Sequence, residues 1–289
     1  MAVPAPPVLV SAEWLAAECE APDLRLLDAT WYLPGSEGDA AADYAVAHIP
    51  GAPFFDIDAV ADRSSDLPHM LPRAEDFAAA VGAMGIGNED RIVVYDRGDI
   101  PSAARLWWMF HVFGHPWVAV LEGGLAAWQA IGGSVRSGPE TVRRRDFTAA
   151  FEPRLVADRA RVLAAVGRGD SQIVDARSSD RFAGTAPEPR PGLARGHIPQ
   201  SRNLPYEALY DVDGRLHDPA TLAARFATAG VDPARPVIAT CGSGISACSI
   251  ALALARLGHR DWAVYDGSWA EWGADPSLPR ELGGNAGKG

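Results

Sequence analysis

Hydrophobic and polar positions alternate along the chain between short apolar runs and longer helical patterns. The runs "RIVVYD" and "PVIATC", which begin at Arg91 and Pro236, are apolar and rich in β-branched residues, as strands buried on both faces are. A helical pattern follows each run and ends at Gly114 or Gly258, and glycine is a typical helix C-cap. This alternation predicts an α/β fold, with a mainly parallel sheet that carries helices on both faces.

A series of short motifs occurs twice in the same order. Asp28 and Asp175 each end an apolar run, and His48 and His197 each begin a His-Ile-Pro block. Further along, "RIVVYDRGDIPSA" matches "PVIATCGSGISA", and "VLEGGLAAW" matches "VYDGSWAEW". Because repeated blocks in one order indicate repeated structure, we interpret the chain as two copies of one α/β unit.

The boundary between the copies is expected in a polar stretch rich in Gly, Pro and Arg, "GGSVRSGPETVRRRDFTAAFEP". We expect an N-terminal domain at residues 1–135, a linker at 136–153 and a C-terminal domain at 154–289. The run Arg143–Arg145 is interpreted as a solvated feature of that linker.

Composition and charge limit the functions to consider. The 289 residues carry a formal net charge of −11, which argues against a nucleic-acid-binding protein but leaves room for a local basic pocket. The three cysteines contain no Cys-x-x-Cys pair, so neither a zinc site nor a thioredoxin-type redox site is predicted. A sparse, odd cysteine count suits a reducing compartment. No apolar run predicts a membrane span or a signal peptide, so a cytoplasmic location is expected.

Cys241 lies where an apolar strand meets a helix, and its counterpart in the first copy is Asp96. In open α/β sheets, ligands bind beyond the carboxyl ends of the strands. Gly242, Ser243 and Gly244 allow the backbone to curl, so that N–H groups and the helix N-terminus can favour a thiolate. The plain alternative is a small buried hydrophobic residue, which is our interpretation of Cys248 within the helix; Cys19 is also expected to be structural.

A cysteine in such an anion-binding loop fits two chemistries. Cysteine-dependent phosphatases use Cys-x5-Arg, in which the arginine binds the phosphate, but the sixth residue after Cys241 is Ala247. The other chemistry is sulfur transfer, in which the cysteine carries the sulfur as a persulfide. The loop sequence favours sulfur transfer.

The repeated motifs, the single cysteine loop and "DGSWAEW" resemble the rhodanese superfamily in its tandem-domain form, from about Leu9 to Trp272. Within that family, "CGSGISA" resembles the loop of 3-mercaptopyruvate sulfurtransferases. Thiosulfate-preferring members usually carry basic residues at the positions of Gly242 and Ser243. The blocks "WYLPG" and "HMLP" resemble the family's inactive N-terminal domain. Departures are Gln200 in "HIPQ", where glycine is usual, and a short loop after Asp96.

The resemblance implies which residues form the site. Arg181 and Arg190, in "DRFAGTAPEPR", would bind the substrate carboxylate, with a surface ion pair as the alternative for each. The persulfide would be held by the loop N–H groups of residues 242–247, which are Gly242, Ser243, Gly244, Ile245, Ser246 and Ala247.

A Ser–His–Asp relay is also implied by the resemblance, with Ser243, His48 and Asp39, or Asp43 in place of Asp39. Each member has a structural alternative. His48 shares its motif with His197, Ser243 can cap the helix, and Asp39 can be an ordinary loop residue.

The function implied by the resemblance is transfer of sulfur from 3-mercaptopyruvate, through a Cys241 persulfide, to thioredoxin, a small thiol or cyanide, with release of pyruvate. No metal or organic cofactor is implied. A thiosulfate:cyanide sulfurtransferase and a non-catalytic sulfur carrier remain as alternatives, because the fold alone does not decide function.

Overall fold

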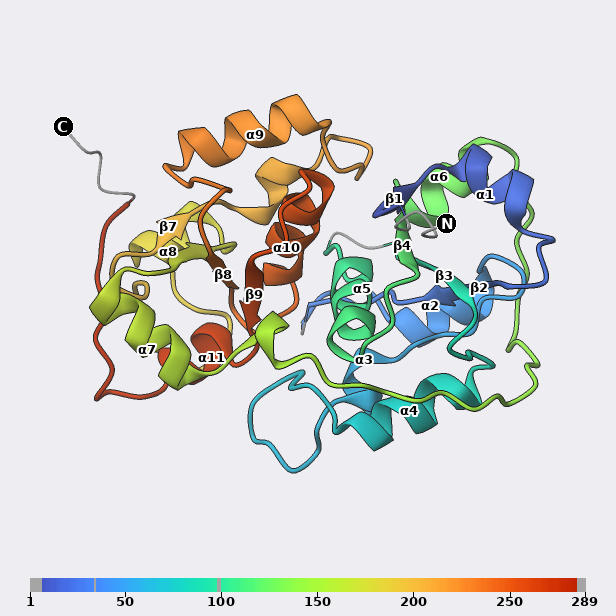
Figure 1. The fold of residues 1–289 in the computed structure, drawn as a ribbon, viewed down its shortest axis with the longest axis horizontal. Coiled ribbons are helices and arrows are strands. Elements are labelled where there is room, and N and C mark those ends of the chain that lie inside the picture. The colour runs from blue at the N-terminus through green and yellow to red at the C-terminus, as the bar shows by residue number, and fades with distance from the viewer. Residues whose placement is uncertain (1–6, 34, 98–99, 285–289) are drawn as a thin grey trace, which may run out of the picture. The chain divides into compact units, whose positions relative to one another are not determined.

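The computed structural model describes residues 7–33, 35–97 and 100–284. The chain divides into two compact units, which are drawn in Figure 1. The N-terminal unit consists of the residues up to Arg63, Leu71–Glu152 and the short segment Val212–Arg215. The C-terminal unit consists of Ser64–Met70, Pro153–Asp211 and the residues from Leu216 onward.

The N-terminal unit alternates short strands and helices. Its strands are β1 (Leu9–Val10), β2 (Leu24–Asp28), β3 (Arg91–Tyr95) and β4 (Val118–Leu121). Its helices are α1 (Ala12–Glu18), α2 (Ala40–Val46), α3 (Ile57–Val60), α4 (Ala74–Ala83), α5 (Ala103–Val112) and α6 (Gly124–Ala130).

The C-terminal unit repeats this alternation. Its strands are β5 (Val156–Ala157), β6 (Gln172–Asp175), β7 (Arg202–Asn203), β8 (Val237–Thr240) and β9 (Trp262–Tyr265). Its helices are α7 (Arg159–Arg168), α8 (Ser179–Ala183), α9 (Pro219–Thr228), α10 (Ala247–Arg256) and α11 (Ser268–Trp272), with 3-10 turns at η1 (Pro153–Leu155) and η2 (Tyr206–Leu209).

The two sheets have matching topologies. Over the described residues, one sheet has the order β1-β4-β3-β2 and the other β5-β9-β8-β6-β7, and the strand pairs are parallel. The edge strand β7 pairs with β6 at Asp175 and Asn203, and an isolated parallel bridge joins Asp28 to Phe54 at the equivalent place. The predicted tandem α/β fold with parallel sheets is therefore confirmed.

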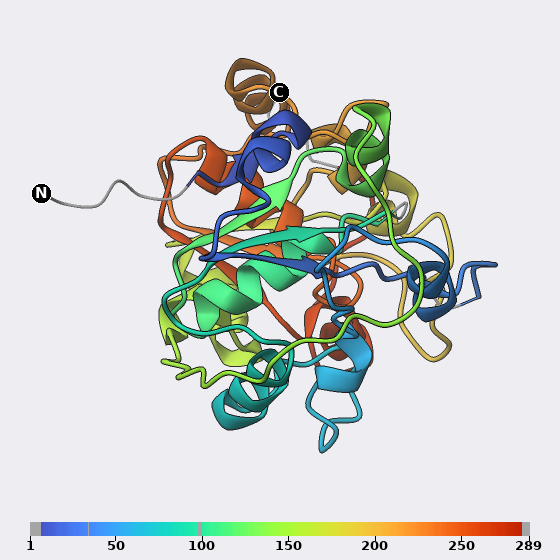
Figure 2. The same cartoon turned by 90° about the vertical axis from the view of Figure 1, so that its right-hand side faces the viewer.

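Each sheet is covered on both faces. In the N-terminal unit, α5 lies along one face while α1 and α6 lie on the other, as Figure 2 shows. The core on the α1 and α6 side includes Leu15, Leu26, Val93, Leu125 and Trp128. In the C-terminal unit α7 and α11 contribute to the corresponding core, and α10 packs on β8 and β9. Strands buried on both faces explain the continuous apolar runs in the sequence.

Helix starts follow ordinary capping rules. The Asp218 side chain accepts hydrogen bonds from the N–H groups of Ala220 and Thr221, and Pro219 occupies the first turn of α9. Asp158 caps α7 in the same way, through the Arg161 N–H. These polar caps fix where each connection leaves its sheet and enters a helix.

Residues 136–152, expected to be a linker, pack on the N-terminal unit instead. The Arg145 guanidinium makes an ion pair with Asp90, Phe147 is buried, and Glu140 accepts a hydrogen bond from the Gly51 N–H at 2.8 Å. The arginine run was expected to be solvated, but Arg145 is anchored because a carboxylate lies opposite it. The composition of the segment resembles a linker, yet its side chains complete the unit.

A departure from glycine occurs at a left-handed backbone position. Gln200 has a φ of +62°, and Gly51 occupies the equivalent place with a φ of +82°. The Gln200 amide donates to the Val166 carbonyl at 3.0 Å, which helps hold a conformation that a side chain disfavours. This contact gives the "HIPQ" departure a structural reason.

Candidate active site

Cys241 directly follows β8, and its thiol is enclosed by the loop that leads into α10. The residue is 2% exposed. The Gly244 N–H donates to Sγ at 3.1 Å, and the Ser268 hydroxyl lies 4.0 Å from the same sulfur. The Gly244 N–H, directed at the sulfur, can stabilise negative charge on it. The strand, the turn and the helix therefore bring a polar cradle around a single thiol.

The two glycines of the loop have different roles. Gly244 has a φ of +82°, a left-handed conformation that directs its N–H toward Sγ. A Cβ at Gly242 would lie 2.8 Å from Nη2 of Arg181, because the guanidinium packs directly against this backbone. A larger residue at Gly242 would displace Arg181, so the neutral loop and the upstream arginine depend on each other.

Ser268 is a site residue that the sequence analysis did not identify. Its hydroxyl accepts the Cys241 N–H at 3.1 Å and donates to the Tyr265 carbonyl at 2.8 Å. Its φ is +49°, and the equivalent position in the first copy is Gly124, with a φ of +52°. The signal was a serine where the repeat has glycine, because a side chain in a strained conformation needs a compensating contact.

The first residues of α11 also support the cysteine loop. The Trp269 N–H donates to the Cys241 carbonyl at 3.0 Å, and the Ala270 N–H donates to the Gly242 carbonyl at 2.9 Å. The motif "DGSWAEW" therefore fixes the backbone on both sides of the thiol.

Arg181 is the predicted substrate arginine that lies at this loop. Its Nη2 donates to the Glu188 carboxylate at 2.6 Å, and its Nε donates to the same oxygen at 3.2 Å. The side chain is 24% exposed, whereas that of Glu188 is 2% exposed. Glu188 was not singled out from the sequence, although it lies in the same motif, "DRFAGTAPEPR".

Arg190 contacts His69, which belongs to the C-terminal unit in space although it precedes the unit's main segments in sequence. Arg190 Nη2 lies 3.1 Å from His69 Nε2. Since a guanidinium only donates, Nε2 must accept, and the proton of a neutral imidazole is then on Nδ1. His69 is 7% exposed and has a φ of +60°. The sequence analysis noted "HMLP" only as a family motif.

His48 was expected in a proton relay, but its contacts in the N-terminal unit are structural. Its ring is fully buried and stacks on Tyr44 at 4.1 Å. Nδ1 contacts the Tyr44 carbonyl at 2.9 Å, and Nε2 contacts the Glu140 carboxylate at 3.2 Å. Both contacts lie within the N-terminal unit, so each ring nitrogen of His48 already has a partner there.

His197 makes the equivalent contacts in the C-terminal unit. Its ring stacks on Phe182 at 3.8 Å, and Nδ1 contacts the Phe182 carbonyl at 2.9 Å. The backbones of His48 and His197 form antiparallel bridges with Arg136 and Glu281, respectively. The histidine of each copy thus fastens a later segment to its own unit, which corresponds to the shared structural role left open by the sequence.

The carboxylate that holds His48 is ionised more readily than usual. Burial alone would raise the pKa of Glu140, but hydrogen bonds from Gly51 and His48 outweigh it and hold the pKa below its ordinary value. A charged Glu140 beside His48 reinforces the attachment of residues 136–152.

Asp39, the relay aspartate expected from the sequence, is the N-cap of α2. Its carboxylate accepts hydrogen bonds from the N–H groups of Ala41 and Ala42 at 3.1 and 3.0 Å. The alternative, Asp43, accepts a hydrogen bond from the Tyr32 hydroxyl at 2.7 Å. These contacts account for both carboxylates within the N-terminal unit.

The remaining cysteines and Ser243 differ in their burial and contacts. Cys248 is fully buried within α10, and its thiol donates to the Gly244 carbonyl at 3.3 Å, as expected of a structural residue. Cys19 is exposed at the C-cap of α1. The N-cap of α10 is Ser246, so Ser243 does not cap this helix. Ser243 is instead 7% exposed within the cradle.

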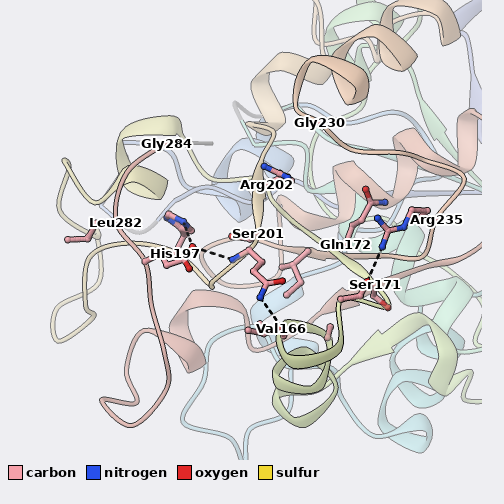
Figure 3. Close-up of a pocket in the computed structure, with 15 residues that line it drawn as sticks. Val166, Ser171, Gln172, His197, Ser201, Arg202, Gly230, Arg235, Leu282 and Gly284 are labelled. Atoms are coloured by element: carbon pink, nitrogen blue, oxygen red, sulfur yellow. Dashed lines mark hydrogen bonds and ion pairs between the residues drawn. The ribbon is translucent and has the colours of Figure 1, made fainter. Parts of the chain in front are cut away.

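A separate cavity of about 560 Å³ lies at the opposite ends of the C-terminal unit's strands and is shown in Figure 3. It is lined by Gln172 and Arg202, which are the first residues of β6 and β7. Cys241 follows the carboxyl end of β8, which is parallel to β6. The cavity therefore lies at the amino ends of the strands and is not part of the cysteine site.

Comparison with known proteins assigns the family. The rhodanese-like domain matches the chain twice, over residues 11–131 and 158–275. The chain therefore belongs to the family of proteins built from rhodanese-like domains, here with two copies in tandem.

Several relatives match nearly the whole chain. The 3-mercaptopyruvate sulfurtransferase of Escherichia coli (strain K12) is 43% identical, over 94% of this chain and 97% of that protein. The thiosulfate sulfurtransferase of Bos taurus is 44% identical, over 91% of each. The crystal structure of SseA, a 3-mercaptopyruvate sulfotransferase from Escherichia coli, matches with a TM-score of 0.84 and 40% identity over 91% of this chain and 99% of that chain.

A membrane-crossing helix would have to be longer and more apolar than any helix in the described part of the chain.

Proposed function

We propose that this protein is a sulfurtransferase that takes sulfur from 3-mercaptopyruvate and carries it as a persulfide on Cys241. The observation that carries the proposal is the packing of the Arg181 guanidinium against Gly242, beside an enclosed thiol that receives a backbone N–H. An arginine beside a thiol cradle suits a donor that bears both a carboxylate and a sulfur.

Overall sequence identity does not indicate which sulfur donor the protein uses. A relative named for 3-mercaptopyruvate is 43% identical to this chain, and one named for thiosulfate is 44% identical. The loop favours 3-mercaptopyruvate. Positive charge comes from Arg181, at the side of the loop, rather than from residues that directly follow the thiol. A carboxylate at one end of the donor and sulfur at the other fit this separation of charge and nucleophile.

The reaction begins when the Cys241 thiolate attacks the donor sulfur. The new S–S bond forms as the C–S bond breaks, and the bonding electrons remain on the organic fragment as the enolate of pyruvate. The proton of the donor thiol passes to that enolate, which gives pyruvate and a deprotonated persulfide. Positive charge from Arg181 and Arg190 would hold the carboxylate throughout this step.

Proton transfer is assigned to Ser243 and His69 rather than to His48 and Asp39. His69 contacts a substrate arginine, whereas both ring nitrogens of His48 are engaged by acceptors. A histidine beside the carboxylate-binding arginine is well placed to serve the donor as a general acid or base.

The second half-reaction transfers the outer sulfur to an acceptor. The acceptor, which is thioredoxin, a small thiol or cyanide, attacks that sulfur. The Cys241 thiolate is then regenerated. The cradle described around Sγ, together with the N–H groups of residues 242–247, would stabilise the persulfide until the acceptor arrives. The step needs no metal or organic cofactor. Free cysteines favour a reducing compartment, and we assign the reaction to the cytoplasm.

The test is mass spectrometry after exposure to 3-mercaptopyruvate, together with steady-state rates on both donors. We expect one added sulfur that maps to Cys241, and a kcat/KM for 3-mercaptopyruvate at least about tenfold above that for thiosulfate, because a bidentate carboxylate contact is lost with the second donor. Cys241→Ser should abolish loading.

Cys248→Ser is the matched control, since this thiol lies within α10 and a serine hydroxyl can keep its hydrogen bond to the Gly244 carbonyl, so loading should stay intact. Sulfur mapped to another cysteine would refute the site. A preference for thiosulfate would favour the rhodanese alternative, and stoichiometric loading without turnover would indicate a sulfur carrier.

A further inference from the structure

Arg181 is held along one edge by a buried carboxylate. Its Nε and Nη2 both donate to Oε2 of Glu188, at 3.2 and 2.6 Å. A guanidinium has five N–H donors, so this contact leaves the edge formed by Nη1 and the second hydrogen of Nη2. That edge is the right shape for one carboxylate. The orientation of the remaining edge is therefore set by Glu188.

Glu188 is in turn fixed from behind. Its Oε1 accepts from Arg177 Nη1 at 2.7 Å, and the side chains of Glu188 and Arg177 are 2% and 0% exposed. Arg177 also pairs with Asp175 at 2.7 Å. The charges thus alternate from Asp175 through Arg177 and Glu188 to Arg181. Each charge of the row therefore has an opposite neighbour, which offsets the cost of burying it.

The same row is attached to the cysteine loop. The Arg177 guanidinium stacks over the Trp269 ring, 4.4 Å from its centroid. Trp269 donates its backbone N–H to the Cys241 carbonyl at 3.0 Å. Glu188 therefore connects the arginine at the loop to a framework that also positions the nucleophile.

We propose that Glu188 is a positioning residue for donor recognition, which fixes the free edge of Arg181 relative to the Cys241 thiol. This inference deepens the proposed function and rests on it. Glu188 does not touch the donor. It acts by occupying one edge of Arg181 and by using its second oxygen to tie that arginine to Arg177.

The test is the variant Glu188→Gln. Glutamine has a single carbonyl oxygen, so it can accept from only one of the guanidinium groups of Arg177 and Arg181, and it directs its NH2 group toward the remaining one. Single-turnover loading with 3-mercaptopyruvate should need an about tenfold or higher donor concentration for half-maximal rate, as expected when a charge-assisted hydrogen bond is lost. Discharge of a preformed persulfide by cyanide should stay within about twofold of wild type, since that step does not use the carboxylate contact.

Asp175→Asn is the matched control. It removes the other carboxylate of Arg177 but does not touch Arg181, so a purely structural role predicts the same kinetics for both variants. We expect a smaller rise in half-maximal donor concentration for Asp175→Asn than for Glu188→Gln, because Asp175 reaches Arg181 only through Arg177 and Glu188; it is measured on folded protein confirmed by circular dichroism. If Asp175→Asn does not fold, Arg181→Ala replaces it, and adding Glu188→Gln to Arg181→Ala should then cause no further loss.

Equal effects on loading and discharge, or an unchanged donor dependence in Glu188→Gln, would overturn the proposal for Glu188. Failure of the underlying function looks different, because the wild-type protein itself would then not load sulfur from 3-mercaptopyruvate.

Discussion

His48 and His197 occupy the same position in the two copies and make the same contacts. Each ring stacks on an aromatic side chain and binds the carbonyl of that same residue. Because both histidines make the same contacts, the fold that the two copies share explains why each copy has one. His69 has no such counterpart in the repeated blocks, and its Nε2 accepts from an arginine proposed to bind substrate.

These histidines give a paired prediction. His69→Asn should lower the rate of persulfide loading by about 100-fold or more, which is typical for loss of a general acid–base group, with little loss of stability. His48→Asn should instead reduce the free energy of unfolding by about 2 kcal/mol, because the Glu140 carboxylate loses one of its buried hydrogen-bond partners while keeping Gly51 and Arg136. Its loading rate per folded molecule should stay near wild type.

Urea unfolding and rapid-quench loading assays measure the two quantities separately. The reverse pattern, a stable but inactive His48→Asn protein, would restore His48 to the relay.

At the same scale, sequence reasoning identified residues by chemical type and missed residues that act through geometry. Cys241 and Arg181 stood out because a thiol in a glycine loop and an arginine in a family motif have known uses. Ser268 did not stand out, because its importance depends on a backbone φ of +49° and a hydrogen bond to the Cys241 N–H. Glu188 depends likewise on which of its neighbours are buried.

At the scale of elements, the sequence predicted the strands and helices well, because their hydrophobic patterns are local. The repeat predicted that the two units share one fold, whereas the order of the strands in each sheet came from the structure. Residues 136–152 were harder to predict, since a polar segment rich in Gly, Pro and Arg has the composition of a linker. Its attachment depends on single long-range contacts, such as Glu140 with His48 and Arg145 with Asp90, which leave no periodic pattern.

The carboxyl end of β3 illustrates how the copies have diverged. Asp96 occupies the place of Cys241, and its carboxylate accepts the Ala103 N–H at 2.8 Å. Burial, with a contribution from the negative charge of Asp28, raises the pKa of Asp96 to about 7. The connection that carries the Cys241 thiol in one copy disfavours negative charge at Asp96 in the other.

This shift predicts a pH dependence of stability. A raised pKa means that the folded state holds the proton more tightly than the unfolded chain. The contribution of protonated Asp96 to the stability of the fold is therefore complete below pH 3.8, the ordinary pKa of an aspartate. It is lost as the pH rises through about 7. Asp96→Asn should remove this loss, so the variant should gain on the order of 2 to 4 kcal/mol relative to wild type above pH 7, after allowance for the partial exposure of the side chain.

Urea unfolding of both proteins at pH 4, 6 and 8 provides the measurement, and the difference between their free energies should grow with pH. A difference that is constant with pH would show that Asp96 is ionised throughout this range.

At the scale of the whole molecule, one fold is used twice with different results. Each copy has the same sheet order and the same structural histidine, but the thiol, its hydroxyl partner Ser268 and the Glu188–Arg181 pair belong to the C-terminal unit. In the first copy, Asp96 occupies the place of Cys241 and Gly124 occupies the place of Ser268. The repeat explains the fold, while the differences between its copies indicate the chemistry.

This division predicts that moving the thiol does not move the activity. In a protein that combines Cys241→Ser with Asp96→Cys, we expect no added sulfur at position 96 after exposure to 3-mercaptopyruvate. Burial and the nearby Asp28 carboxylate, which raise the pKa of Asp96, would raise that of a thiol there as well. The loop also contains Pro101, which has no N–H to give to a persulfide.

Peptide mapping by mass spectrometry measures the result, with wild type as the positive control and a thiol count in denaturant to show that the new thiol is intact. Circular dichroism should show a folded protein. Sulfur bound at position 96 would mean that a thiol at the end of the central strand is sufficient. Its absence, with Cys241 loading in the wild type, would mean that the surrounding donors and the arginine at the loop are what make this fold an enzyme.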